Sequence, residues 1–198
     1  MNYSFVDSEL KALIRLLDDP DSSVFENVSN RLVSIGKTVI PYLETEWEQH
    51  DQNGIQTRIE EIIHQIEFEV CKNNLSIWKN EGAQSIFDGA IITGMMQYPD
   101  QQVELLNGKL EWLRKDVWLE LNDNLTSLEK VRVLNHIIYD VHNFGPYPKY
   151  LSSDQCWFMC NLLDTHKGSP TTMAILYKAI AEKLDLPIVG INLPDHFI

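Results

Sequence analysis

The sequence has few cysteines and no long apolar run. Cys71, Cys156 and Cys160 are its only cysteines, an odd and widely spaced set that suits neither a disulfide framework nor a zinc motif. We interpret them as buried structural thiols. No apolar stretch approaches the roughly 18–20 residues of a membrane-spanning helix, and the N-terminus, MNYSFVDSELK, lacks the pattern of a secretory signal. We therefore expect a cytoplasmic protein without a metal, a cofactor or a membrane segment.

Basic residues are also scarce. The 198 residues include 16 Lys and Arg against 29 Asp and Glu, which gives a formal net charge of −13. A surface of that sign repels phosphate backbones and anionic lipid headgroups. The composition therefore argues against nucleic acid and membranes as partners and leaves a protein or peptide. It does not determine the oligomeric state.

The first 122 residues have the pattern of consecutive amphipathic helices. Apolar residues with the i, i+3, i+4, i+7 spacing of one helix face occur at Leu10, Leu13, Ile14 and Leu17. The motif DDPD at residues 18–21 ends that helix, and Asp21 or Ser22 can cap the next. Gly36 suits the end of the second helix. Further helices are predicted over 84–97, where two glycines indicate close packing, and over 100–121.

The segment LIRLLDDPDSSVFENVSNRLVSIGKTVIPYL resembles a HEAT-type repeat. It has a helix, a DxPD turn, a second helix and then a glycine. HEAT-like units stack their apolar faces on neighbouring helices, so this copy is expected to pack against the helices that follow it. An ordinary helical hairpin predicts the same local structure, and the sequence leaves both interpretations open.

The second predicted region covers residues 123–198, and the character of the sequence changes within it at Asn143. Thr126 and Glu129 fit a capping box, and the helix they open is predicted to bury Leu128, Val131, Leu134, Ile138 and Val141. The stretch NFGPYPKYLSS contains a glycine and two prolines and therefore cannot be a regular helix. Ser169 and Pro170 suit the N-cap and first position of a helix that runs to about Leu184. A short buried strand, IVGIN, is predicted after it.

The order of these cues resembles the transglutaminase-like superfamily, in particular its SirB-type bacterial branch. The cues are Leu163-Asp164, Gly168-Ser169-Pro170, Leu184-Asp185-Leu186-Pro187 and Pro194-Asp195-His196-Phe197. The resemblance implies a mainly α (α+β) protein. A helical, HEAT-like region over 1–122 would precede a partial papain- or transglutaminase-like core with few strands over 123–198. The family's sheet continues past this point, so we expect the core to be truncated at Ile198.

The resemblance also implies a site, with one departure. Active members carry a cysteine two residues after the helix-start glycine, where the helix dipole and free N–H groups stabilise a thiolate. Here that residue is Pro170, which has no nucleophile. His196 matches the family's catalytic histidine. The implied groove is lined by Asp164, Gly168, Ser169, Pro170, Thr171, Tyr177 and His196.

Other residues are weaker candidates for a nucleophile. Ser169 is adjacent to Pro170, but its hydroxyl is better explained as a helix cap, and Cys160 lies on the preceding helix. His196 could line a ligand groove or form a hydrogen bond in the core. His136 and Asp140 share a helix face, with His142 just beyond, and are interpreted as a surface pair. His64 and His166 carry no signal.

Three functions follow from this pattern. The first is a non-catalytic transglutaminase-like module that binds a protein segment or a small ligand near Ser169 and His196. The second is a hydrolase or acyl transferase with a displaced nucleophile such as Cys160 or Ser169. The third is a helical scaffold or adaptor whose C-terminal fold is a relic. The departure at Pro170 favours the first.

Overall fold

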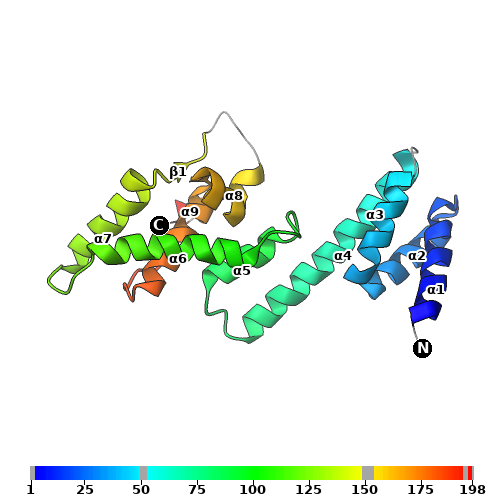
Figure 1. Cartoon of the computed structure of the whole chain (residues 1–198), viewed down its shortest axis with the longest axis horizontal. Helices are drawn as coiled ribbons and strands as arrows, with labels where there is room; N and C mark the ends of the chain where they lie inside the picture. Colours follow the sequence, from blue (N-terminus) through cyan, green and yellow to red (C-terminus); the bar gives the residue numbers. More distant parts are fainter. Residues whose placement is uncertain (1–2, 50–52, 149–153, 194–195, 198) are drawn as a thin grey trace. The chain divides into compact units, whose positions relative to one another are not determined.

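The computed structural model describes residues 3–49, 53–148, 154–193 and 196–197, with the side chains of residues 9–49, 54–148 and 154–191. The described residues are mostly helical (Figure 1), which confirms the mainly α fold. The chain forms two compact units, Met1–Asn74 and Leu75–Ile198. The domain boundary expected after residue 122 was drawn from the family resemblance, whereas these two units are defined by their internal contacts. That boundary stays a prediction.

The N-terminal unit is a set of helices around one apolar core. Its elements are α1 (Tyr3–Arg15), η1 (Leu16–Asp18), α2 (Ser22–Ile35), η2 (Lys37–Val39), α3 (Ile40–Gln49) and the first part of α4 (Asn53–Asn80). The predicted start and end of the second helix are confirmed. The Asp21 carboxylate accepts a hydrogen bond from the Ser23 N–H at 2.8 Å at the start of α2. Gly36 ends that helix with a φ of 81°, a backbone angle that glycine adopts without strain.

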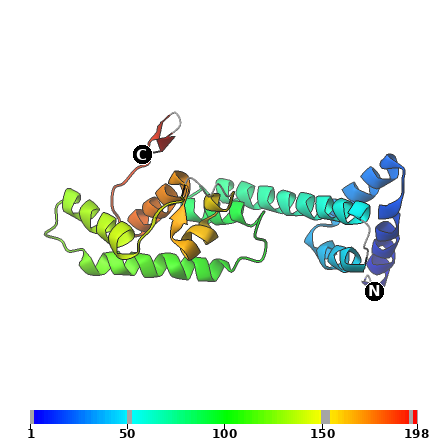
Figure 2. The ribbon, with the colours of Figure 1, turned by 90° about the horizontal axis from the view of Figure 1, so that it is seen from above.

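The C-terminal unit contains most of the remaining elements. Its helices are α5 (Ile86–Gly94), α6 (Val103–Glu120), α7 (Ser127–Asn135), the π-helical η3 (His136–Val141), the 3₁₀-helical η4 (Asp154–Trp157), α8 (Met159–Thr165) and α9 (Pro170–Lys183). Helices α5, α6 and α8 pack around α9 (Figure 2). Their shared core includes Leu110, Leu162, Leu176 and Ile180. The central helix of the unit is therefore the one whose start was singled out in the sequence.

Short strands accompany these helices. β1 (Gly145–Pro146) pairs in parallel with β2 (Lys167–Gly168), in the register Gly145–Lys167 and Pro146–Gly168. β3 (Asn192–Leu193) pairs antiparallel with β4 (His196–Phe197), and β4 lies beside α9. The predicted buried strand at IVGIN is wrong over its described side chains, since Val189 and Ile191 are 75% and 53% exposed. Within the described residues no strand pairs with 188–191, and Ile188 alone of its apolar side chains packs partly against the core.

The helix that begins at the capping box buries a different set of residues from the one predicted. Thr126 and Glu129 form the capping box as expected, and Leu134 and Ile138 are buried. Leu128 is exposed. It lies six residues before the buried Leu134, and at 100° per residue the two side chains point about 120° apart around the helix. Val141 is exposed as well. The prediction of an inward Leu128 and Val141 was therefore wrong.

The π-helical turn accounts for the second of these differences. The His142 N–H donates to the Ile137 carbonyl at 3.0 Å, five residues back rather than four. A π-helical turn takes up one extra residue. Downstream side chains therefore shift by one position, which buries Ile137 and His142 and leaves Val141 in solvent.

Two glycines give a matched test of packing in this unit. A Cβ built at Gly89 in α5 would lie 2.9 Å from Cζ2 of Trp78, whereas a Cβ at Gly108 in α6 would meet nothing within 4 Å. We expect Gly89→Ala to lower the free energy of unfolding by about 1–3 kcal/mol. Gly108→Ala should raise it by about 0.5–1 kcal/mol. Chemical denaturation followed by circular dichroism measures both. An equal or stabilising effect of Gly89→Ala would contradict the packing described.

Candidate functional site

The start of α9 is fixed by hydrogen bonds of the Ser169 and Thr172 hydroxyls. Ser169 is the N-cap, and its Oγ accepts from the Thr172 N–H at 3.2 Å. The Thr172 hydroxyl donates to the Cys156 carbonyl at 3.0 Å. Both side chains are buried, Ser169 with 4% exposure. The capping role predicted for Ser169 is therefore confirmed, and its oxygen is withdrawn from solvent.

The β1–β2 pair holds this helix start in place. The Gly145 N–H donates to the His166 carbonyl at 3.0 Å, and the Tyr147 N–H donates to the Gly168 carbonyl at 2.8 Å. Gly168 must be small, since a Cβ there would lie 2.6 Å from the Thr172 Oγ1 and 2.9 Å from Cδ1 of Leu162. The glycine of the Gly-Ser-Pro motif thus permits the close approach of the strand to the helix.

Two of the residues implied by the sequence motif line a common depression of about 420 Å³ beside α9. These are Pro170 and Tyr177, which share it with Asn135, Tyr139, Met173, Ala174, Lys178, Ile188, Val189 and Gly190. The lining is mixed, with apolar side chains, two phenols, one amide and one lysine. Among the described lining residues there is no cysteine, serine or threonine. These residues offer contact surface and hydrogen-bonding groups.

Two tyrosines of this lining, Tyr139 and Tyr177, stack on each other. Their rings stack at 6.2 Å between centroids with an interplanar angle of 15°. The Tyr177 hydroxyl donates to Oδ1 of Asn135 at 2.8 Å. Burial, assisted by the nearby Tyr139, raises the pKa of Tyr177 to about 12, and burial also raises the pKa of Tyr139. Both phenols are therefore neutral donors at physiological pH.

The remaining sequence candidates lie elsewhere or cannot be placed. Cys160 is buried in α8, outside the depression, and burial, with a smaller contribution from the charge of Asp164, raises the pKa of its thiol. Asp164 is exposed and forms an ion pair with Lys109. Thr171 is exposed and not among the lining residues. The side chain of His196 lies outside the described residues, although its strand β4 runs beside α9.

A histidine cluster was not found by sequence reasoning. His142 is buried, and its Nε2 lies 3.0 Å from Oδ2 of Asp116 on α6. Its carbonyl accepts a hydrogen bond from Nδ1 of His166 at 2.7 Å, and the His166 ring stacks on Phe144 at 4.4 Å. These contacts tie the end of η3 and the approach to β1 onto α6 and α8. The 26 residues between Asp116 and His142 gave no local signal for the pair.

The other histidine motif matches its interpretation. Nδ1 of His136 lies 2.9 Å from Oδ2 of Asp140, and both side chains are more than 60% exposed. This is a surface pair, as the sequence indicated. Within the described ranges no group of three or more His, Cys, Asp or Glu side chains is arranged to hold a metal ion.

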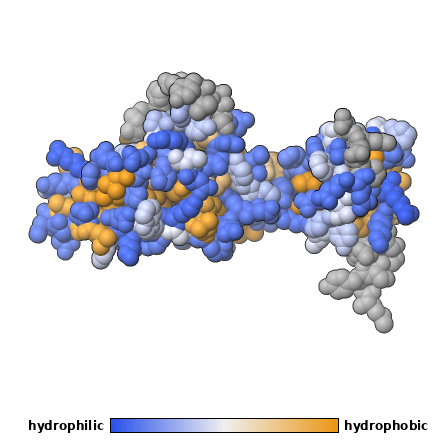
Figure 3. Space-filling model, turned by 45° about the horizontal axis from the view of Figure 1, so that its top comes forward, coloured by the Kyte–Doolittle hydropathy of each residue, from blue (hydrophilic) through white to orange (hydrophobic). Residues whose placement is uncertain are grey.

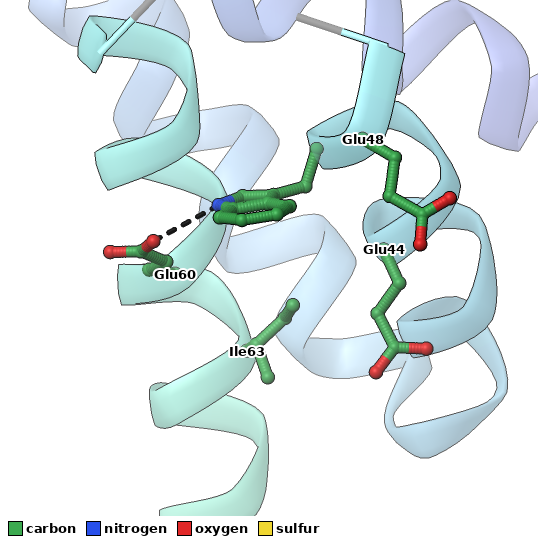
Figure 4. A pocket seen from close by; sticks show the side chains of 5 residues that line it. Glu44, Glu48, Glu60 and Ile63 are labelled. Carbon is green, nitrogen blue, oxygen red and sulfur yellow. Dashed lines mark hydrogen bonds between the residues drawn. The ribbon is translucent and has the colours of Figure 1, made fainter. Parts of the chain in front are cut away.

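A second depression lies in the N-terminal unit, between α3 and α4 (Figure 4). It is lined by Glu44, Trp47, Glu48, Glu60 and Ile63. The indole N–H of Trp47 donates to Oε1 of Glu60 at 3.0 Å, which holds the ring across the opening. Three carboxylates in one lining disfavour an anionic ligand.

Comparisons with known proteins agree with the arrangement around α9. A family model described as the transglutaminase-like superfamily matches residues 104–198. This part of the chain is a transglutaminase-like domain. The UPF0162 protein PM0557 of Pasteurella multocida (strain Pm70) is 27% identical over 95 residues, which are 47% of this chain and 35% of that protein. The chain thus spans about a third of the length of this curated relative. No solved structure matches.

The domain matched by the family model contains α9, both strand pairs, and the depression with Pro170 and Tyr177. Among the described helices, none combines the length and the apolar character that crossing a membrane requires.

The raised pKa of Tyr177 predicts a specific loss of stability in alkali. An acid whose folded pKa exceeds its unfolded value, here about 10, contributes stability below that value and loses it as the pH approaches the folded pKa. We expect the unfolding free energy of the wild-type chain to fall more steeply between about pH 10 and 12 than that of Tyr177→Phe. Denaturant midpoints measured across this range test it. Parallel curves for the two proteins would contradict a neutral, buried phenol.

Proposed function

We propose that the transglutaminase-like domain is a non-catalytic module that holds a segment of a partner protein in the depression beside α9. The observation that carries this proposal is Pro170. It occupies the first position of α9 and lines the depression. The resemblance places the cysteine of active members at this residue. A proline ring offers apolar surface where those members present a thiolate, which suits binding rather than covalent chemistry.

The environment of the alternative nucleophiles supports the same proposal. Ser169 is buried, and its oxygen accepts the capping hydrogen bond, so it is not presented to a substrate. The Cys160 thiol is buried and its raised pKa disfavours the thiolate. A displaced nucleophile of either kind would require the helix start or the core around it to open.

The lining suits an extended peptide. Apolar contact would come from Pro170, Met173 and Ile188, and the Tyr139 hydroxyl and the Lys178 ammonium provide donors for backbone carbonyls. We include His196 in this groove, because β4 lies beside α9 and the resemblance puts the histidine at the same site. Here the histidine would contact the peptide instead of activating a thiol.

Two finer assignments accompany the proposal. The order of the Gly-Ser-Pro, Leu-Asp-Leu-Pro and Pro-Asp-His-Phe motifs supports the SirB-type branch of the superfamily. The pairing of α1 with α2 across the Asp21 cap supports a HEAT-like hairpin that serves as a scaffold. We place the protein in the cytoplasm, where its thiols would stay reduced.

A groove-filling substitution tests the binding function. Peptides selected by phage display against the whole chain serve as probes, and calorimetry measures their affinity. Ala174→Arg places a long charged side chain within the lining and should weaken binding by at least about tenfold, an effect of the size seen at interface hot spots. Thr171→Arg makes the same change on the same helix outside the lining and should leave the affinity unchanged. Equal affinities for both variants would place the peptide elsewhere.

Thiol labelling separates this function from an enzyme with a displaced nucleophile. With a disulfide reagent near neutral pH, Cys156 should react readily because it is partly exposed. Cys71 and Cys160 should react only after unfolding, because burial raises the pKa of both thiols. Rapid modification of Cys160 in the folded protein, together with hydrolysis of a glutamine-containing peptide that Cys160→Ala abolishes, would favour the enzyme.

The adaptor function remains a second candidate because of one observation. Trp47 is 38% exposed at the opening of the glutamate-lined depression, and exposed tryptophans are enriched at binding surfaces. If the selected peptides lose affinity with Trp47→Ala and keep it with Ala174→Arg, the helical unit is the binding element and the groove is a relic.

A further inference from the structure

Helix α6 carries two apolar faces. The buried face consists of Leu106, Leu110, Leu113 and Val117. The opposite face presents Leu105, Trp112 and Leu119, which are 54%, 55% and 62% exposed. These three residues are spaced by seven, so they lie within about 40° of one another around the helix, at 100° per residue. A surface helix of a monomer needs only the first face. On the second face, the Trp112 ring contacts the His142 ring edge-to-face at 4.7 Å between centroids, and more than half of each of the three side chains stays exposed.

This exposed stripe has two-fold symmetry in its sequence. A leucine stands seven residues before Trp112 and another stands seven residues after it. When two copies of α6 pair antiparallel about an axis at Trp112, Leu105 of each copy faces the partner's Leu119, and the two tryptophans meet at the centre. A two-fold interface requires one surface that is complementary to itself. The spacing of the stripe meets that requirement.

The charges beside the stripe fit the same pairing. Lys109 and Asp116 lie along one edge, three residues before and four residues after Trp112. Within its own chain Lys109 pairs with Asp164, and Asp116 contacts His142. In the antiparallel pair, Lys109 lies within about one residue of the level of the partner's Asp116, so these opposite charges come near each other twice. On the other edge Glu111 lies near the partner's Lys115. Over Val103–Glu120 four acidic residues stand against three basic ones, whereas the whole chain has a net charge of −13. Repulsion between copies is therefore weak along this helix.

We propose that the stripe Leu105–Trp112–Leu119 is a self-association surface, through which two copies of this chain pair their α6 helices antiparallel. Figure 3 shows hydrophobic residues gathered at the surface of the part of the chain that contains the transglutaminase-like domain. Helix α6 is about 27 Å long at 1.5 Å per residue, so the contact is at the small end of specific interfaces. The dimer consequently dissociates in the micromolar range.

Sedimentation equilibrium of the full chain tests the proposal, with a tryptophan elsewhere on the same helix as the control. Trp118 is 57% exposed, nearly the same as Trp112, but it points about 120° away from the stripe. Trp112→Ala should raise the dissociation constant by at least about tenfold, and Trp118→Ala should leave it within about twofold. Leu119→Lys, at a site without core contacts, should act like Trp112→Ala and guards against a folding defect. Circular dichroism confirms that each variant is folded.

Crosslinking tests the antiparallel arrangement. Leu105→Cys and Leu119→Cys are prepared as separate variants and treated with a short bismaleimide. Antiparallel pairing predicts a crosslinked dimer only when the two variants are mixed, because residue 105 faces residue 119 of the other copy. The wild-type chain controls for its native thiols.

Other outcomes overturn the proposal. These are a monomer up to roughly 0.2 mM, well above a micromolar dissociation constant, a dimer equally weakened by Trp118→Ala, and crosslinks within each single variant. The first would show that the stripe is covered by a different occupant. The third would show a parallel pair.

Discussion

The arrangement of the C-terminal unit depends on one turn of backbone, where strand β2 passes into helix α9. Ser169 caps the helix, Thr172 bonds back to the Cys156 carbonyl, and Gly168 provides the space for both. The two hydroxyls form hydrogen bonds with backbone groups that would otherwise be buried without a partner. These hydrogen bonds fix the backbone at the helix start, where the family resemblance implies a thiol in active members and this sequence has Pro170.

The lining of the depression beside α9 includes the first residue of that helix, Pro170. With a proline at the first helical position, the apolar ring joins the tyrosine pair and the exposed segment at Val189 in one continuous lining. The phenols stay neutral because they are partly buried next to each other. A surface of neutral donors and apolar rings discriminates by shape and hydrogen bonding more than by charge. In a chain with a net charge of −13, the described lining carries one lysine, Lys178, and no carboxylate.

Local features were predictable from the sequence and long-range ones were not. The caps at Asp21, Thr126 and Ser169 are encoded within three residues, so their motifs were sufficient. The Asp116–His142 pair joins residues 26 apart, and only the fold brings them together. Periodicity failed at Val141 because a π-helical turn changes the spacing on which the prediction relies. It also failed at 188–191, where an apolar run was taken as buried although burial depends on neighbouring strands. The groove inferred from the family motif was only partly localised, since the side chain of His196 is not described.

The π-helical turn has a consequence for how this domain can change over evolution. Its extra residue sets the phase in which the side chains after it meet the core, so packing depends on the length of the segment from His136 to Val141 as well as on its composition. A deletion of one residue there would restore an ordinary α-helical repeat and turn the imidazole of His142 away from α6. The β1–β2 pair would then lose its anchor. Insertions and deletions should consequently be rarer in this stretch than in the loops on either side of it.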